Sequence, residues 1–88
     1  MADIEIYMTA VCPFCIRAKR LLDKKGVDYS ERCVDQNPGF WEEIEDRCGR
    51  DTVPQLFIGD HHVGGFDDMV ELDFDGELDQ LLGLVTEG

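Results

Sequence analysis

The sequence has no long hydrophobic run, and its second half has no basic residue. No window approaches the roughly 18 apolar residues that a membrane-spanning helix requires, and the first residues lack the basic and apolar regions of a secretory signal. We therefore expect a cytoplasmic protein. Residues 51–88 carry 10 acidic residues and no Lys or Arg, and the net charge of the whole chain is −12. This charge disfavours nucleic acids and anionic membranes as partners, because both are bound through Lys and Arg that neutralise phosphate.

Length and composition predict one folded domain over residues 1–88. Single domains run from about 50 residues upward, and a chain this short does not build two cores. Because 43% of the residues are apolar, the chain does not have the low hydrophobicity of disordered proteins. Three interpretations of the acidic charge stay open: a surface that favours solubility, attraction to a basic partner protein, or adaptation to high salt.

Local sequence patterns predict alternating strands and helices. Residues 3–8 alternate polar and apolar as in a half-buried strand, and Gly26 is the expected end of a helix that begins at Pro13. The full expected order is strand 3–8, helix 13–25, strand 27–34, helix 38–49, strand 55–58, strand 61–63, a helix opening at Asp67–Asp68 and a last helix over 76–84. The order β-α-β-α-β-β-α indicates an α/β fold with a small four-stranded mixed sheet and helices on both of its faces.

Side-chain spacing also predicts which residues lie in the core. Cys33 and Cys48 are expected to be buried as small apolar side chains, and His61 and His62 to lie on the surface. The expected core positions of the helices are Ile16, Ala18, Leu21, Leu22, Trp41, Met69, Val70, Leu72, Leu78, Leu81 and Leu82.

The most informative motif is Cys12-Pro13-Phe14-Cys15, which lies where the first strand ends and the first helix begins. A helix start presents unpaired N–H groups and the positive end of the helix dipole, so it stabilises a thiolate at Cys12. Because the thiolate is the nucleophile, lowering the thiol pKa from about 8.5 toward roughly 3.5–7.5 makes the residue reactive at neutral pH. We expect Cys15, one turn further on, to be more buried and to stay a thiol until it resolves a mixed disulfide.

Four cysteines allow a zinc site, a structural disulfide or a redox-active dithiol. Zinc needs a second pair of ligands, and Cys33 and Cys48 are separated by fourteen residues, which is a poor spacing for a structural zinc site. A structural disulfide is rare in a reducing compartment. A CxxC motif near a βαβ pattern favours the redox-active dithiol.

The chain resembles a dithiol glutaredoxin, of the thioredoxin-like superfamily, over nearly its whole length. Three motifs carry the resemblance: Cys12-Pro13-Phe14-Cys15, Thr52-Val53-Pro54 and Gly64-Gly65-Phe66-Asp67-Asp68. The resemblance implies a thioredoxin-like fold and glutathione-dependent reduction of protein disulfides and glutathionylated proteins. Cys12 and Cys15 are then the catalytic residues of a monomeric enzyme, glutathione is the co-substrate, and no metal is expected.

The resemblance also implies a glutathione site. In the family the Val53–Pro54 peptide is cis, which turns the backbone of Val53 toward the cysteines, where an extended tripeptide pairs with it as a short added strand. N–H groups at the following helix start hold the γ-glutamyl carboxylate, and Asp68 or Asp67 meets the ammonium. The implied glutathione-binding residues are Thr9, Phe14, Thr52, Val53, Pro54, Gly65, Phe66, Asp67 and Asp68.

One departure from the family concerns the glycine carboxylate of glutathione. Many relatives have a lysine shortly before the first cysteine, whereas residues 9–11 here supply none. Where the family often has a further basic or amide residue, this chain has Asp46 and Asp51, with Arg47 and Arg50 close by. The cation for that carboxylate is therefore one of these arginines or is missing.

Two alternative functions stay open within the same fold. As in some relatives, two copies would hold a [2Fe–2S] cluster through Cys12 and glutathione, although a proline after the first cysteine disfavours this bridging. Alternatively, the protein is reduced by thioredoxin reductase and donates electrons to ribonucleotide reductase. Gly65-Phe66 resembles a motif of that group, whereas Thr52-Val53-Pro54 and the paired acids resemble glutathione users.

Overall fold

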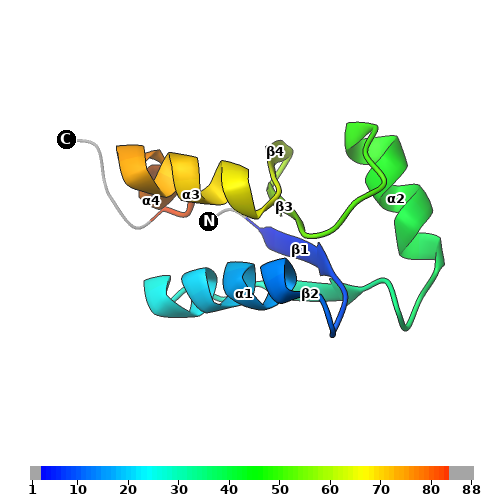
Figure 1. Ribbon diagram of the computed structural model, residues 1–88. Helices are drawn as coiled ribbons and strands as arrows, with labels where there is room; N and C mark the ends of the chain where they lie inside the picture. Colours follow the sequence, from blue (N-terminus) through cyan, green and yellow to red (C-terminus); the bar gives the residue numbers. More distant parts are fainter. Residues whose placement is uncertain (1–2, 84–88) are drawn as a thin grey trace.

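The computed structural model describes residues 3–83, which form a four-stranded sheet with helices on both faces (Figure 1). The elements are β1 (Ile4–Met8), α1 (Pro13–Lys25), β2 (Ser30–Cys33), α2 (Gly39–Cys48), β3 (Gln55–Ile58), β4 (His61–Gly64), α3 (Phe66–Asp75) and α4 (Glu77–Leu81). The strand order is β2-β1-β3-β4, with β1 parallel to β2 and β3 antiparallel to both of its neighbours. The predicted α/β fold with a mixed sheet is confirmed. No helix among the described residues is long and apolar enough to cross a membrane.

Two elements differ from the expectation by three residues at one end. The strand expected over 27–34 forms a ladder only at Ser30–Cys33, because its partner β1 begins at Ile4 and the register pairs Glu5 with Ser30. The last helix is shorter than the expected range of 76–84, and Leu84 lies outside the described residues.

Both faces of the sheet are buried, each against its own helices. The first cluster, under α1, α3 and α4, consists of Ile4, Ile6, Ala18, Leu22, Leu56, Ile58, Val63, Met69, Leu78 and Leu82. The second cluster, under α2, consists of Tyr7, Val34, Ile44 and Phe57. Neighbouring residues of β1 point to opposite faces, so Ile6 joins the first cluster and Tyr7 the second. The expectation of a half-buried first strand was therefore wrong, because both of its faces are covered.

Two side chains assigned to the core lie on the surface. Ile16 is 41% exposed and Val70 is 44% exposed. In α1 the neighbouring Cys15 takes the inward position and is completely buried, which rotates Ile16 outward. In α3 the neighbouring Met69 is the buried residue, so Val70 points away from the sheet.

Other core predictions have mixed outcomes. Leu78 and Leu82 are buried as predicted, and Trp41 is partly buried against the second cluster. Cys33 and Cys48 were expected to be buried but are only partly so. Both lie at the last residue of their element, where fewer neighbours cover the side chain.

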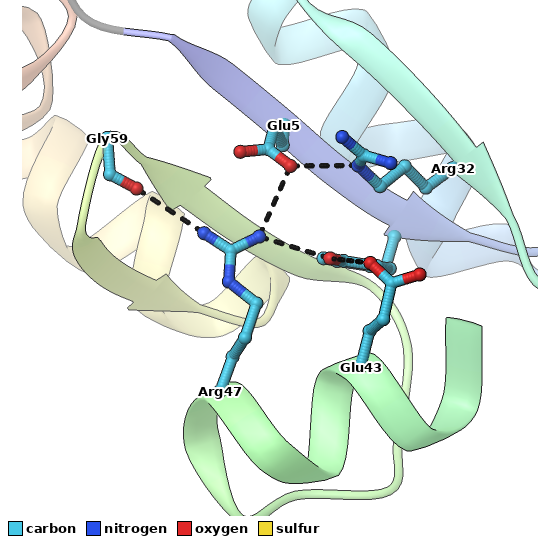
Figure 2. A network of polar contacts seen from close by, with 6 residues as sticks. Glu5, Arg32, Glu43, Arg47 and Gly59 are labelled. Carbon is cyan, nitrogen blue, oxygen red and sulfur yellow. Dashed lines mark hydrogen bonds and ion pairs between the residues drawn. The ribbon is translucent and has the colours of Figure 1, made fainter. Parts of the chain in front are cut away.

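A polar network fastens α2 to the sheet (Figure 2). Arg47 of α2 donates hydrogen bonds to Glu5 at 3.2 Å and to the Tyr7 hydroxyl at 3.0 Å. Its guanidinium also lies 3.9 Å from the ring centroid of Phe57, a cation–π contact. The whole network consists of Glu5, Tyr7, Arg32, Glu43, Arg47 and the Gly59 carbonyl. Arg47 is thus committed to the α2 face of the sheet.

Helices α1 and α3 lie side by side and begin at the same end of the molecule. At their starts, the Phe14 and Phe66 ring centroids are 6.3 Å apart. Near their ends, Lys25 forms ion pairs with Asp73 and Asp79. Because contacts join start to start and end to end, the two helices run in the same direction. Two helix N-termini therefore open toward one region, which contains the dithiol.

Candidate active site

Cys12 is the N-cap residue of α1, with Pro13 following it in the first turn. Burial raises the pKa of Cys12, but the Cys15 N–H and thiol, the Phe14 N–H and the Thr9 hydroxyl together lower that pKa below its ordinary value. These groups favour the thiolate, so Cys12 has the environment of a nucleophile.

Cys15 has the opposite environment. Its side chain is completely buried, and burial raises the pKa of the Cys15 thiol to about 11. The thiolate of Cys12 nearby adds to this rise. Cys15 therefore stays protonated at neutral pH, and the expectation that it is the more buried cysteine is confirmed.

A groove of about 240 Å³ reaches the dithiol at Phe14. Its lining residues are Phe14, Arg50, Thr52, Val53, Pro54, Gln55, Gly65, Phe66, Asp67 and Asp68. Eight of the nine residues expected to bind glutathione are therefore brought together, although the motifs come from three separate parts of the chain. The ninth, Thr9, is absent from the described lining and instead interacts with the two cysteines. The Val53–Pro54 peptide is cis, as expected.

The start of α3 closes one side of this groove. The Gly65 N–H donates a hydrogen bond to Asp68 Oδ2 at 3.0 Å, and Arg50 donates to the same oxygen at 3.4 Å. Gly64 has a φ of +117°, and a Cβ added there would lie 2.2 Å from Asp68 Oδ2. A glycine is thus needed at residue 64 for the Asp68 carboxylate to reach this position.

The two arginines considered for the glycine carboxylate differ in position. Arg50 lines the groove, and its side chain is 50% exposed. Arg47 instead lies in the network between α2 and the sheet. Of these two arginines, Arg50 is the one that lines the groove, where it forms an ion pair with Asp68 at 3.4 Å.

The sequence and the fold were compared with those of known proteins. The glutaredoxin family model matches residues 4–63. The chain belongs to the glutaredoxin family. It is 51% identical over 82 residues to glutaredoxin 3 of Escherichia coli K12, a match that covers 93% of this chain and 99% of that protein.

Solved glutaredoxins have the same fold. A buckwheat glutaredoxin–glutathione complex is 30% identical with a TM-score of 0.86, over 97% of this chain and 83% of that one. The solution structure of a Brucella melitensis glutaredoxin is 43% identical with a TM-score of 0.82, over 100% and 96%. This chain is therefore a dithiol glutaredoxin with a thioredoxin-like fold, and its family supports a role in thiol–disulfide oxidoreduction.

Sequence inspection missed one groove residue, Gln55, and its hydrogen bond to His62 on the neighbouring strand. Gln55 is a 1% exposed polar residue, and its Nε2 donates to Thr52 Oγ1 at 3.1 Å. Its Oε1 lies 2.8 Å from His62 Nε2, and because Oε1 only accepts, His62 donates from Nε2. His62 is half-buried rather than exposed as expected, and burial, followed by the charge of Arg50, lowers its pKa. The only sequence signal for this pair is a polar residue at the start of an otherwise apolar strand.

The described residues give the zinc hypothesis no support. Residues 3–83 contain no group of three or more His, Cys, Asp or Glu side chains arranged to hold a metal ion. Cys33 and Cys48 are consequently not gathered with the dithiol, and the Cys48 thiol instead donates to the Ile44 carbonyl at 3.2 Å. Cys33 lies at the end of β2 and Cys48 at the end of α2.

Proposed function

We propose that this glutaredoxin uses glutathione to reduce protein disulfides and glutathionylated proteins in the cytoplasm. The observation that carries the proposal is the groove of Phe14, Thr52–Pro54 and Gly65–Asp68 beside a cysteine whose pKa is lowered. The buckwheat relative was solved in complex with glutathione, which supports the same ligand here. All four cysteines are free, as suits a reducing compartment.

Glutathione would lie in the groove as an extended peptide. Its backbone would pair with Val53 as an added strand, and its γ-glutamyl carboxylate would meet the N–H groups at the start of α3. Asp68 or Asp67 would receive its ammonium. Asp68 is the better oriented of the two, because the hydrogen bond from Gly65 already fixes its carboxylate.

Removal of glutathione from a protein needs only one cysteine. The Cys12 thiolate attacks the glutathione sulfur of the mixed disulfide, forming a bond between Cys12 and glutathione and breaking the bond to the protein. The protein leaves as a thiolate and takes a proton from water. A second glutathione thiolate then attacks the glutathione sulfur on Cys12, which gives oxidised glutathione and restores the Cys12 thiolate.

Reduction of a protein disulfide uses both cysteines. Cys12 attacks one sulfur of the disulfide and forms a mixed disulfide with the protein. Cys15 then loses its proton and attacks Cys12, which releases the reduced protein and leaves a Cys12–Cys15 disulfide. Two glutathione molecules supply the two electrons that reduce it, and glutaredoxin potentials of roughly −200 to −230 mV suit this exchange.

The electron source is tested by a coupled assay that follows NADPH consumption. With glutathione and glutathione reductase, the protein should turn over a small glutathione mixed disulfide, because the proposal places that tripeptide in the groove. Thioredoxin reductase without glutathione should give no turnover above background. Turnover with thioredoxin reductase alone would contradict the glutathione assignment and favour the alternative redoxin function.

Arg50 is expected to attract the glycine carboxylate of glutathione. A charge-assisted hydrogen bond contributes about 1.5–3 kcal/mol when buried, and the half-exposed Arg50 should contribute less, so Arg50→Gln should raise the KM for glutathione about three- to tenfold. Steady-state kinetics at varied glutathione measures this change. Arg20→Gln removes the same charge from an exposed position on α1 and should leave KM unchanged. Equal KM values for wild type and Arg50→Gln would show that this arginine does not bind the carboxylate.

A further inference from the structure

An apolar stripe leads from the groove along the outer side of α3. Phe66, Val70 and Phe74 are four residues apart and so follow one side of the helix, over about 12 Å at 1.5 Å per residue. Phe66 is half-buried in the groove, whereas Val70 is 44% and Phe74 is 92% exposed. The stripe begins against Phe14, which is itself 51% exposed, so it is continuous with the wall of the groove.

The fold does not require these exposed apolar side chains. Helix α3 already anchors itself to the sheet through the completely buried Met69. Phe74 loses almost no contact with water on folding, and a polar residue would serve the helix equally well. Contiguous exposed apolar side chains bordered by polar residues are typical of interaction sites.

A row of unpaired acids borders the stripe. Asp67, Glu71 and Asp75 each follow one stripe residue in the sequence, and all three are exposed. Within residues 3–83 none of the three takes part in an ion pair, whereas Asp73 on the same helix pairs with Lys25. The row therefore presents negative charge that is available to a cation from outside the chain.

We propose that this stripe docks a segment of the redox partner protein, namely the segment beside its disulfide or glutathionylated cysteine. The segment is expected to carry large apolar side chains for Val70 and Phe74, with Lys or Arg that reach Glu71 and Asp75. Continuity with the groove places such a segment beside Cys12 while the partner's sulfur reacts. The proposal rests on the proposed function, because the docked partner is the substrate of the same dithiol.

Charge argues against a second copy of this chain on the stripe. Each copy carries a net charge of −12, and self-association through α3 would bring two unpaired acidic rows together. A basic segment would instead be attracted to the acidic row. The preferred partner is thus a different protein with a positive surface near its reactive cysteine.

The test compares two synthetic peptides, each glutathionylated at a single cysteine. One carries Leu, Phe and Arg next to the cysteine, and the other carries only Gly and Ser; the glutathione mixed disulfide of 2-hydroxyethanethiol is the small substrate. Wild type should show a kcat/KM about tenfold higher for the apolar, basic peptide. The V70S/F74S variant should reduce this preference to about twofold or less while leaving the small substrate unchanged.

Ile16→Ser is the matched control, because Ile16 is 41% exposed on the other helix and should not affect the preference. Glu71→Gln with Asp75→Asn should lower the preference about threefold and weaken its dependence on salt. Thermal unfolding of each variant verifies that it is folded, as expected for exposed positions. A preference that survives in V70S/F74S, or that Ile16→Ser reduces equally, would overturn the docking proposal.

Two further outcomes separate this proposal from others. A wild type that is dimeric by light scattering, with monomeric V70S/F74S, would assign the stripe to a second copy and overturn the proposal. No glutathione-dependent turnover of the small substrate would instead contradict the proposed function. Fluorescence anisotropy with the two peptides would then decide the docking by itself, since equal affinity for both would refute it.

Discussion

Replacing Cys12 with serine is expected to abolish reduction of both protein disulfides and glutathione mixed disulfides, with at least about a thousandfold loss of kcat/KM. A serine hydroxyl stays protonated where the thiol ionises, and both reaction modes begin with attack by that thiolate. Cys15→Ser should keep removal of glutathione and lose the dithiol reduction of protein disulfides. Steady-state assays with the two substrate types measure the difference between the variants.

The pH dependence of alkylation is a second test of Cys12 as the nucleophile. Because hydrogen bonds lower the pKa of Cys12, the thiolate persists to lower pH than in an ordinary cysteine. Alkylation by iodoacetamide should therefore proceed at neutral pH at Cys12 and not at Cys15, whose pKa is raised to about 11. The rate should fall as pH falls through the Cys12 pKa, where the thiolate is lost. Residual turnover in Cys12→Ser, or a Cys12 that alkylates only at alkaline pH, would refute the scheme.

Gly64→Ala is expected to produce the largest loss of stability from a single methyl group. The substitution combines a φ of +117° with a Cβ 2.2 Å from Asp68 Oδ2, so Asp68 must leave the Gly65 N–H. We expect the free energy of unfolding to fall by about 2–4 kcal/mol. The KM for glutathione should also rise, because displaced Asp68 no longer holds the groove wall. Urea denaturation and steady-state kinetics measure the two effects.

Gly59→Ala separates backbone strain from the collision with Asp68. Gly59 also has a positive φ, +60°, but an added Cβ would have no atom within 4 Å. Gly59→Ala should therefore lower the free energy of unfolding by only about 1 kcal/mol, the cost of the backbone conformation, and should leave the KM for glutathione unchanged. Equal losses at the two glycines would mean that contact with Asp68 contributes nothing to the stability of this turn.

The sequence predicted those features that depend on local chemistry. Helix α1 has the expected bounds because Pro13 can only begin a helix, and Gly26 ends it with a φ of +74°. Gly49 ends α2 in the same way, with a φ of +73°. Most of the groove was also predictable, because each of its motifs resembles a motif of the glutaredoxin family.

Features that depend on the direction of a side chain in the assembled fold were not predictable. Arg47 and Arg50 are three residues apart, but α2 ends between them. Arg47 points from α2 to the sheet and bonds to Tyr7, whereas Arg50 lines the groove. The buried face of α1 was assigned with Ile16 in it, one residue beyond Cys15. In the structure Cys15 is completely buried and Ile16 is 41% exposed, so the buried face is shifted by one residue, or about 100° around the helix.

Because α1 and α3 begin side by side, the region around the dithiol has a local positive potential although the net charge of the protein is negative. Two helix dipoles present their positive ends at the dithiol, while the surface as a whole is strongly negative. If glutathione is the ligand, this anionic tripeptide should be repelled by the net charge at long range and attracted by the helix dipoles at short range. Dissolved ions screen the distant repulsion first, since it acts beyond the Debye length of roughly 10 Å in 0.1 M salt. Ionic strength should therefore change mainly the association rate of such an anion, whereas the helix dipoles should affect mainly its dissociation rate.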